Sequence, residues 1–246
     1  MPKLLPLRQI ILVSLVSCLS YTSSVSATDQ MVEERRVAYS AYEHKNYKLA
    51  FILLNKLAKQ GDVYANFNLA HLLESGQGTP VDIKRAIQHY KFAVENGVLA
   101  AANNLGVIYS DGVGDESGEL AIYYYKLAAD QGNARAQSNL AQLYLMGDGV
   151  EYDVAIAHEY FSKAALQNDA LSQYQLGVMY FKGDGVEKDF INAYAWILLA
   201  KQNGDTQAQY ILDELKPLLD SAELFRAKER SINIRQLIAE KLSTKH

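Results

Sequence analysis

Cysteine is almost absent from this chain of 246 residues, and its one occurrence, Cys18, lies near the start. A single cysteine excludes a disulfide within the chain, a CxxC redox pair and a zinc site built from cysteine ligands. Proline is also scarce, with four residues, and no segment after residue 20 is apolar enough to cross a bilayer. The fold must therefore be held together by noncovalent packing.

Basic residues are too few for a nucleic-acid binder. The chain has 24 Lys and Arg against 28 Asp and Glu, a formal charge of −4 at pH 7, whereas binding to a phosphate backbone requires a basic surface. Hydrophobic residues make up 49% of the chain and charged residues 21%, as in folded rather than disordered proteins. We predict a folded protein without a nucleic-acid partner.

Residues 1–27 have the features of an export signal. Lys3 and Arg8 supply a positive start, the apolar stretch IILVSLVSCL follows, and the segment ends in the small residues VSA. We expect cleavage after Ala27, which places the mature protein in the periplasm or outside the cell. The stretch LVSC at 15–18 resembles a bacterial lipobox and leaves an alternative, in which Cys18 becomes the lipid-modified first residue of a membrane-anchored lipoprotein.

The remainder of the chain is a repeat. Pairs of glycines recur at steps of 36, 35 and 36 residues, and alanines, aromatic residues and leucines recur with the same period. The columns include Gly76, Gly112, Gly147 and Gly183; Ala86, Ala121, Ala157 and Ala193; Tyr90, Tyr125, Phe161 and Ile197; and Leu69, Leu105, Leu140 and Leu176. Within each copy the apolar residues are spaced three or four apart, so each copy is expected to form two helices. No segment alternates with period two, and we predict an all-α fold.

The recurring glycine loop resembles a ligand loop but is better explained as a corner. In MGDGVEYD, residues 146–153, Gly147 follows the end of a predicted helix, where glycine adopts the left-handed conformation that closes it. Asp153 comes six residues later and can cap the next helix, as can Asp82, Ser117 and Asp189 in the same column. A phosphate loop requires a preceding strand and a Gly-Lys-Ser/Thr ending, and a calcium loop requires alternating acidic residues. Neither pattern is present.

These columns resemble those of the Sel1-like repeat family, a relative of tetratricopeptide repeats. The pattern is met by AAANNLGVIYSDGVG and by LSQYQLGVMYFKGDGVEKDFINAYAWILLAKQNG. The resemblance implies an α/α solenoid, a right-handed superhelix of antiparallel helix pairs with a concave surface for partners, and it does not imply an enzyme. We divide the helical domain, residues 28–246, into a tetratricopeptide-like first repeat at 28–62, repeats at 63–98, 99–133, 134–169 and 170–205, and an incomplete repeat with a C-terminal capping helix at 206–246.

The predicted binding surface lies on the first helix of each repeat. Carboxamides recur there as a ladder, and because an amide both donates and accepts hydrogen bonds, a row of them could hold an extended peptide. The alternative is that these amides bond neighbouring loops or face water. The candidate partner-binding residues are Phe67, Asn68, His71, Asn103, Asn104, Asn139, Gln142, Tyr174 and Gln175.

No catalytic, cofactor or metal motif is recognisable. His44, His71, His89 and His158 occupy unrelated positions, and no nucleophile elbow, HExxH or paired-carboxylate motif occurs. We predict a non-catalytic scaffold for protein–protein interaction in the bacterial envelope. The alternative is an envelope hydrolase or a cell-wall or β-lactam-binding protein on the same repeats, although the paired cysteines of the β-lactam-linked branch are lacking.

The C-terminal segment differs in charge from the repeats. Residues 221–246 carry six basic and three acidic side chains, whereas residues 37–220 carry 14 basic and 22 acidic ones. We expect a helix from about Ser221 to Leu242 that caps the last repeat, partly through this complementarity. Its predicted packing face consists of Leu224, Ala227, Ile234, Leu237 and Ile238.

Overall fold

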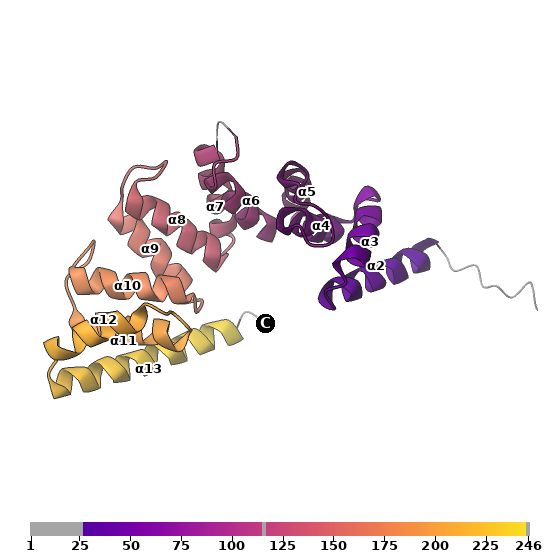
Figure 1. The fold of residues 1–246 in the computed structure, drawn as a ribbon. Coiled ribbons are helices and arrows are strands. Elements are labelled where there is room, and N and C mark those ends of the chain that lie inside the picture. The colour runs from indigo at the N-terminus through magenta and orange to yellow at the C-terminus, as the bar shows by residue number, and fades with distance from the viewer. Residues whose placement is uncertain (1–26, 115–116, 245–246) are drawn as a thin grey trace, which may run out of the picture.

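The helices of this protein form one open arc. The computed structural model describes residues 27–114 and 117–244, and every regular element in these ranges is a helix. Figure 1 shows the helices following one another from α2 at one end of the arc to α13 at the other. The all-α solenoid expected from the sequence is thereby confirmed. The predicted export signal, apart from Ala27, lies outside the described residues, as does Cys18.

Consecutive helices pack against each other in pairs. We call the members of each pair the first and the second helix. The first helices are α2 (Ala27–Glu43), α4 (Val63–Ser75), α6 (Ala100–Ser110), α8 (Ala134–Met146) and α10 (Ala170–Lys182). The second helices are α3 (Tyr47–Lys59), α5 (Ile83–Glu95), α7 (Ser117–Asp130), α9 (Val154–Ala165) and α11 (Phe190–Gln202).

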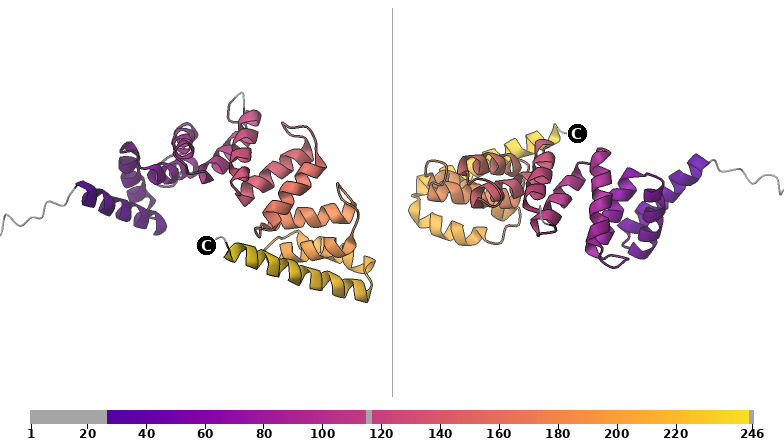
Figure 2. Two further views of the ribbon diagram at one scale, coloured as in Figure 1. Left: turned by 180° about the vertical axis from the view of Figure 1, so that it is seen from behind. Right: turned by 90° about the horizontal axis from the view of Figure 1, so that it is seen from above.

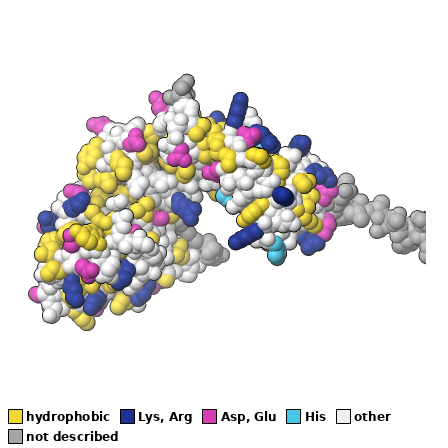
Figure 3. Space-filling view, viewed as in Figure 1, with side chains coloured by type: hydrophobic (Ala, Val, Ile, Leu, Met, Phe, Trp, Pro, Cys, Tyr) yellow, Lys and Arg dark blue, Asp and Glu magenta, His cyan; other side chains and the backbone are white. Residues whose placement is uncertain are grey.

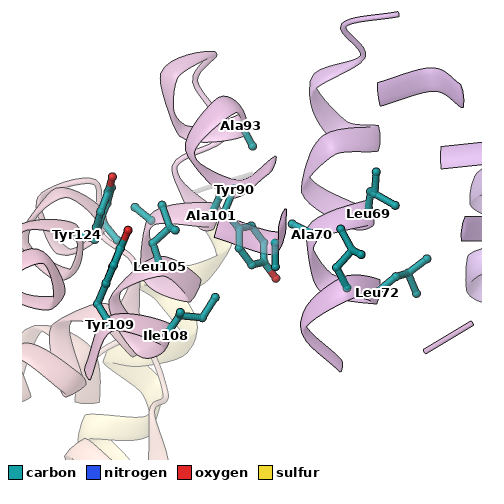
Figure 4. Packing of buried hydrophobic residues seen from close by; sticks show 14 of the residues in the cluster. Leu69, Ala70, Leu72, Tyr90, Ala93, Ala101, Leu105, Ile108, Tyr109 and Tyr124 are labelled. Carbon is teal, nitrogen blue, oxygen red and sulfur yellow. The ribbon is translucent and has the colours of Figure 1, made fainter. Parts of the chain in front are cut away.

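The core runs along the arc between the first and the second helices. Leu69 and Leu105, from one predicted column, are fully buried, and so is Tyr90. Figure 4 shows the Tyr90 side chain in the space between the helix that carries Ala70 (α4) and the helix that carries Ala101 and Leu105 (α6). Farther along, the rings of Tyr109 and Tyr124 lie nearly parallel, with centroids 5.7 Å apart. Each repeat therefore completes the core of its neighbours, as in other solenoids.

Glycine within a first helix allows the second helix to approach closely. A Cβ atom placed on Gly106 would lie 2.4 Å from the ring of Tyr125, and one placed on Gly177 would lie 2.4 Å from Ile197. These distances are far shorter than a van der Waals contact. The packing explains why glycine is found inside these helices despite its low helix propensity.

The glycine loops are corners, as predicted. Gly147 and Gly183 end α8 and α10 in the left-handed conformation, with φ of 68° and 81°. The Asp153 side chain then caps α9 by accepting a hydrogen bond from the Ile156 backbone N–H at 2.9 Å. Ser117 differs from this pattern, because α7 begins at Ser117 itself.

The last helix, α13 (Ser221–Ser243), closes the C-terminal end of the arc. It follows α12 (Ala208–Leu215) and the short 3-10 helix η1 (Lys216–Leu218), and it packs against α11. Ala227 and Ile238 are buried, as predicted for the packing face. Leu237 was assigned to the wrong face: it is 52% exposed, because it lies one residue, about 100° of helix rotation, away from Ile238.

The contact between α13 and the repeats is apolar and hydrogen-bonded. Arg230 Nε donates to Asn192 Oδ1 at 3.0 Å, and Arg235 Nη1 donates to Gln202 Oε1 at 3.3 Å. No ion pair joins α13 to the other described helices. The expected charge complementarity therefore does not act through direct ion pairs, and Figure 3 shows both signs of charge mixed over this end of the molecule, at the lower left.

Candidate functional site

A polar hollow lies on the inner side of the arc. Its volume is about 350 Å³, and we call it the central hollow. It is lined by Glu74, Asn103, Asn104, Val107, Arg135, Ser138, Asn139, Asp169 and Leu171. These residues belong to α4, α6 and α8 and to the start of α10. Because four successive first helices meet there while the intervening second helices do not, the hollow lies on the concave face.

Two buried polar atoms at the central hollow have no hydrogen-bond partner. Asn103 is 8% exposed and Ser138 is 2% exposed, and within the described part of the chain Asn103 Oδ1 and Ser138 Oγ are both unpaired. Such an atom costs about 1–3 kcal/mol when it is left unsatisfied, and most buried polar atoms are paired. A ligand that donates hydrogen bonds would satisfy both atoms at once.

The neighbouring amides of the hollow interact with tyrosine hydroxyls of the preceding repeat. The amide of Asn104 lies near the Tyr90 hydroxyl, and the amide of Asn139 lies near the Tyr125 hydroxyl. Burial raises the pKa of both tyrosines, and the two amides lower it by a smaller amount. Asn104 and Asn139 therefore connect consecutive repeats in addition to lining the hollow.

Glu74 contributes a carboxylate to the wall of the hollow. The Tyr90 hydroxyl donates a hydrogen bond to Glu74 Oε2 at 2.6 Å, and His71 Nδ1 lies 3.8 Å from the same oxygen. Burial raises the pKa of Glu74, but the neighbouring His71 and the hydrogen bond from Tyr90 outweigh this effect and bring the pKa below its usual value. Glu74 is therefore ionised at neutral pH.

A larger pocket lies between α2 and α4, and we call it the N-terminal pocket. Its volume is about 750 Å³. It is lined by Arg35, Tyr39, Tyr42, Glu43, Gly61, Asp62, Val63, Tyr64 and Asn68. The carboxylate of Asp62 is buried and paired with Arg35 at 2.6 Å. Burial and the Asp62 charge raise the pKa of Tyr39 to about 12, so Tyr39 presents a neutral ring to the pocket.

The two pockets use equivalent positions of the repeat. Tyr64 and Asn68 in the N-terminal pocket correspond to Arg135 and Asn139 in the central hollow, two repeats later. Equivalent residues of a solenoid lie on the same face. The pockets therefore open on one continuous surface, aromatic at its N-terminal end and polar at its centre.

The structure brings together four of the nine predicted partner-binding residues at these two pockets. Asn103, Asn104 and Asn139 line the central hollow, and Asn68 lines the N-terminal pocket. His71 lies beside the hollow through its contact with Glu74.

The other predicted residues lie outside both pockets. The ring of Phe67 packs against that of Tyr90, with centroids 5.9 Å apart. Tyr174 is half-buried against the C-terminal core. Gln142 and Gln175 are half-buried and line neither pocket.

A second amide column, which the sequence analysis missed, has a structural role. Gln137 Nε2 donates to the backbone carbonyl of Ala129 at 3.0 Å, and Gln173 Nε2 donates to that of Ala165 at 3.2 Å. In both cases the acceptor lies in the last turn of the preceding second helix. Asn66 makes the equivalent bond to Ala58 at 3.4 Å. The available signal was that the three amides occupy the same position of the repeat, which Ala102 occupies in the copy between Asn66 and Gln137.

His89 and His158 are half-buried and make separate contacts. His89 Nδ1 lies 2.7 Å from Asn66 Oδ1, and burial is the main reason that the pKa of His89 is lowered. The ring of His158 contacts that of Tyr180 at 5.9 Å, and burial lowers its pKa too. In the described ranges, no group of three or more His, Asp or Glu side chains is placed to hold a metal. No helix in those ranges has the length and apolar character that a membrane span requires.

Comparison with known families identifies the repeat. The Sel1 repeat model matches residues 43–62, 63–98, 99–133, 134–169 and 170–205. Together these segments make up more than half of the chain. No curated protein matches the chain in sequence.

Two solved structures show the same architecture. A protective antigen of uropathogenic Escherichia coli strains is 29% identical, with a TM-score of 0.78; the match covers 86% of this chain and 46% of the antigen. This chain therefore spans about half the length of that relative. A Sel1 repeat protein from Oxalobacter formigenes is 28% identical, with a TM-score of 0.71 and coverage of 89% and 92% of the two chains.

An immunity protein from Pseudomonas aeruginosa has a related fold. It is 19% identical, with a TM-score of 0.50, and the match covers 82% of this chain and 81% of the immunity protein. At this identity the likeness concerns the fold alone.

Proposed function

Because this chain belongs to the Sel1 repeat family, we propose that it is a non-catalytic scaffold that binds a partner protein on the inner side of its arc. The partner contributes an extended segment, which lies across the first helices between the N-terminal pocket and the central hollow. Both pockets open on this surface, so one segment can contact them in turn.

The observation that carries the proposal is the pair of unpaired atoms at the central hollow. Asn103 Oδ1 and Ser138 Oγ are buried and lack a partner within the described residues, whereas the amides of the neighbouring column bond the backbone. A structural role therefore explains Gln137 and Gln173 but leaves Asn103 and Ser138 without a function in the free protein. A bound segment supplies the missing donors, and such buried contacts usually dominate the affinity of an interface.

The proposed place of action is the cell envelope. The support is the positive start, the apolar stretch and the small-residue end of residues 1–27. The mass of the mature protein tests this directly, because cleavage after Ala27 leaves Thr28 as the first residue. If the mature protein instead began with a lipid-modified Cys18, it would be a membrane-anchored lipoprotein.

A crosslinking experiment tests the binding surface. A photo-crosslinking residue is placed at Arg135, on the central hollow, and as a control at Tyr123, which is 58% exposed on the second helix α7. We expect a discrete crosslinked partner from position 135 and none from position 123. Equal crosslinking at both positions would show that the inner face has no special role.

One substitution separates binding from folding. Asn103→Leu replaces a buried, unpaired amide oxygen by an apolar side chain of similar shape, so it should leave the melting temperature unchanged or slightly raised. The same variant should lose the partner crosslinked at position 135. If Asn103→Leu unfolded the protein, the amide would be structural; if it retained the partner in full, the unpaired oxygen would not be the binding contact.

A further inference from the structure

The central hollow presents several hydrogen-bond acceptors, and its one charged donor is the exposed side chain of Arg135. Glu74 and Asp169 each present a carboxylate, and Asn103 Oδ1 and Ser138 Oγ are unpaired. Asp169 also accepts a hydrogen bond from the Ser172 backbone N–H at 2.8 Å, through Oδ1. The amides of Asn104 and Asn139 each lie beside a tyrosine hydroxyl, which their N–H groups can face.

The charge of the lining is negative. Glu74 and Asp169 contribute two negative charges, and Arg135 contributes the only positive charge among the lining residues. Arg135 is exposed, so water and salt screen its charge more than that of the half-buried Glu74. An entering cation therefore meets a net attraction, and an entering carboxylate meets a net repulsion.

From these features we propose that the central hollow receives a single arginine side chain of the partner segment. The inference rests on the proposed function and names the group that the site recognises. A guanidinium has five N–H donors in one plane and no acceptor, which matches a lining of two carboxylates, an amide oxygen and a hydroxyl. A lysine ammonium has three donors at one point and can reach fewer of these acceptors.

The two probes are blocked peptides of five residues, four alanines around one central arginine or one central citrulline. Citrulline keeps the shape of arginine but is neutral. Each peptide is titrated into the protein at low salt, and the side-chain amide NMR signals of Asn103 and Asn104 are followed. The arginine peptide should shift these signals to saturation, and the citrulline peptide should bind at least tenfold more weakly. Equal binding of the two would overturn the requirement for a cation.

Two variants locate the arginine in the hollow. Asn103→Leu should weaken the arginine peptide at least tenfold. Asp169→Asn removes one charge but keeps a residue that can cap α10, and it should weaken binding about threefold or more. The matched control is Asp153→Asn, the same change at the cap of α9, which lies outside the hollow and should leave the affinity unchanged. If all three variants bound equally, the arginine would lie elsewhere.

The outcomes also separate this inference from the proposed function. A peptide with a central glutamate is included, and preferred binding of that peptide would make Arg135 the recognition group and overturn the proposal. If no peptide bound while position 135 still crosslinked its partner, the proposed scaffold function would be retained and the proposed arginine site would be wrong. If neither bound, both proposals would fall.

Discussion

The Tyr90 hydroxyl donates a 2.6 Å hydrogen bond to Glu74 Oε2, and this contact joins the second helix α5 to the wall of the central hollow. Tyr90 is fully buried, and Phe161, which occupies the equivalent position two repeats later, is fully buried as well. A phenylalanine therefore fits the space, and the hydroxyl can be removed without changing the packing.

Tyr90→Phe should lower the free energy of unfolding by about 1.5–3 kcal/mol, the usual range for a hydrogen bond to a charged group. Urea denaturation measures this. The pKa of Glu74 is lowered in the folded protein, so its contribution to stability is present at neutral pH and is lost as the pH falls through the folded pKa. Without the tyrosine hydroxyl that pKa rises toward its unfolded value, so the acid-dependent loss of stability should be smaller. Identical acid profiles for the two proteins would contradict the assigned role.

Gly106→Ala should destabilise the protein by about 1–3 kcal/mol, because the added Cβ would lie 2.4 Å from the Tyr125 ring. The control is Gly118→Ala in the first turn of α7, where a Cβ has no neighbour within 4 Å. That change should be neutral or stabilising, by up to about 1 kcal/mol, because alanine has the higher helix propensity. Equal melting temperatures for the two variants would mean that the α6–α7 contact is looser than described.

Gly147→Val should cost about 1–2 kcal/mol or more, because a β-branched residue is strained at a φ of 68°. The matched change Asp148→Val falls on an exposed side chain of the same loop and should cost less than about 0.5 kcal/mol. Thermal unfolding of both variants measures the difference. Similar losses at the two positions would argue against a conformational requirement at Gly147.

Stability should decrease as the pH falls below about 6.5, the usual pKa of histidine. Burial lowers the pKa of His158 and of His89 in the folded protein, so below that pH the unfolded chain binds more protons than the native one. His158→Ile, with the residue found at the equivalent positions 87 and 122, should flatten this decline between pH 6.5 and 5. His44→Gln, at an exposed histidine, is the control, and an unchanged slope in His158→Ile would refute the assignment.

Removal of residues 221–246 should destabilise the last repeat and cause self-association. Ala227 packs in one cluster with Ile197 and Leu215, so the deletion exposes an apolar end of the arc. We expect the melting temperature to fall by about 5 °C or more, equivalent to roughly 2 kcal/mol, together with a larger mass in light scattering. A truncated protein that stayed monomeric and melted like its parent would show that α13 is not a cap.

The repeat, the helices and the corners could be predicted because each depends on nearest neighbours along the chain. A buried alanine or leucine, a left-handed glycine and a capping aspartate have the same surroundings in every copy, so the sequence shows them as columns. Leu237 was misplaced because no repeat covers α13 and one residue of register decides which side faces α11. The N-terminal pocket was missed for a similar reason, since residues 27–62 lack the glycine loop that aligns the other copies.

The candidate site could be predicted only in part. Amides recur in two columns of the first helices, and their roles depend on the direction of each side chain relative to the preceding second helix. Gln137 donates a hydrogen bond to the Ala129 carbonyl, whereas Asn103 Oδ1, in the next column, has no hydrogen-bond partner among the described residues. The sequence shows that such amides recur with the period of the repeat, but it does not show how far each amide lies from a carbonyl in another helix. The amides that bond the backbone could therefore not be distinguished from those that are unpaired.

The open arc can also change its curvature. The larger contacts join each helix to the next one or the next but one along the chain, and the left view of Figure 2 shows the arc open from behind. If the two ends of the arc are pulled apart, each pair of helices therefore rotates slightly relative to the next pair. Glu74 and Asp169 lie on opposite sides of the central hollow, on α4 and at the start of α10, and their separation must change as the arc straightens. Tension on the molecule thus alters the spacing of the charges that a bound segment meets.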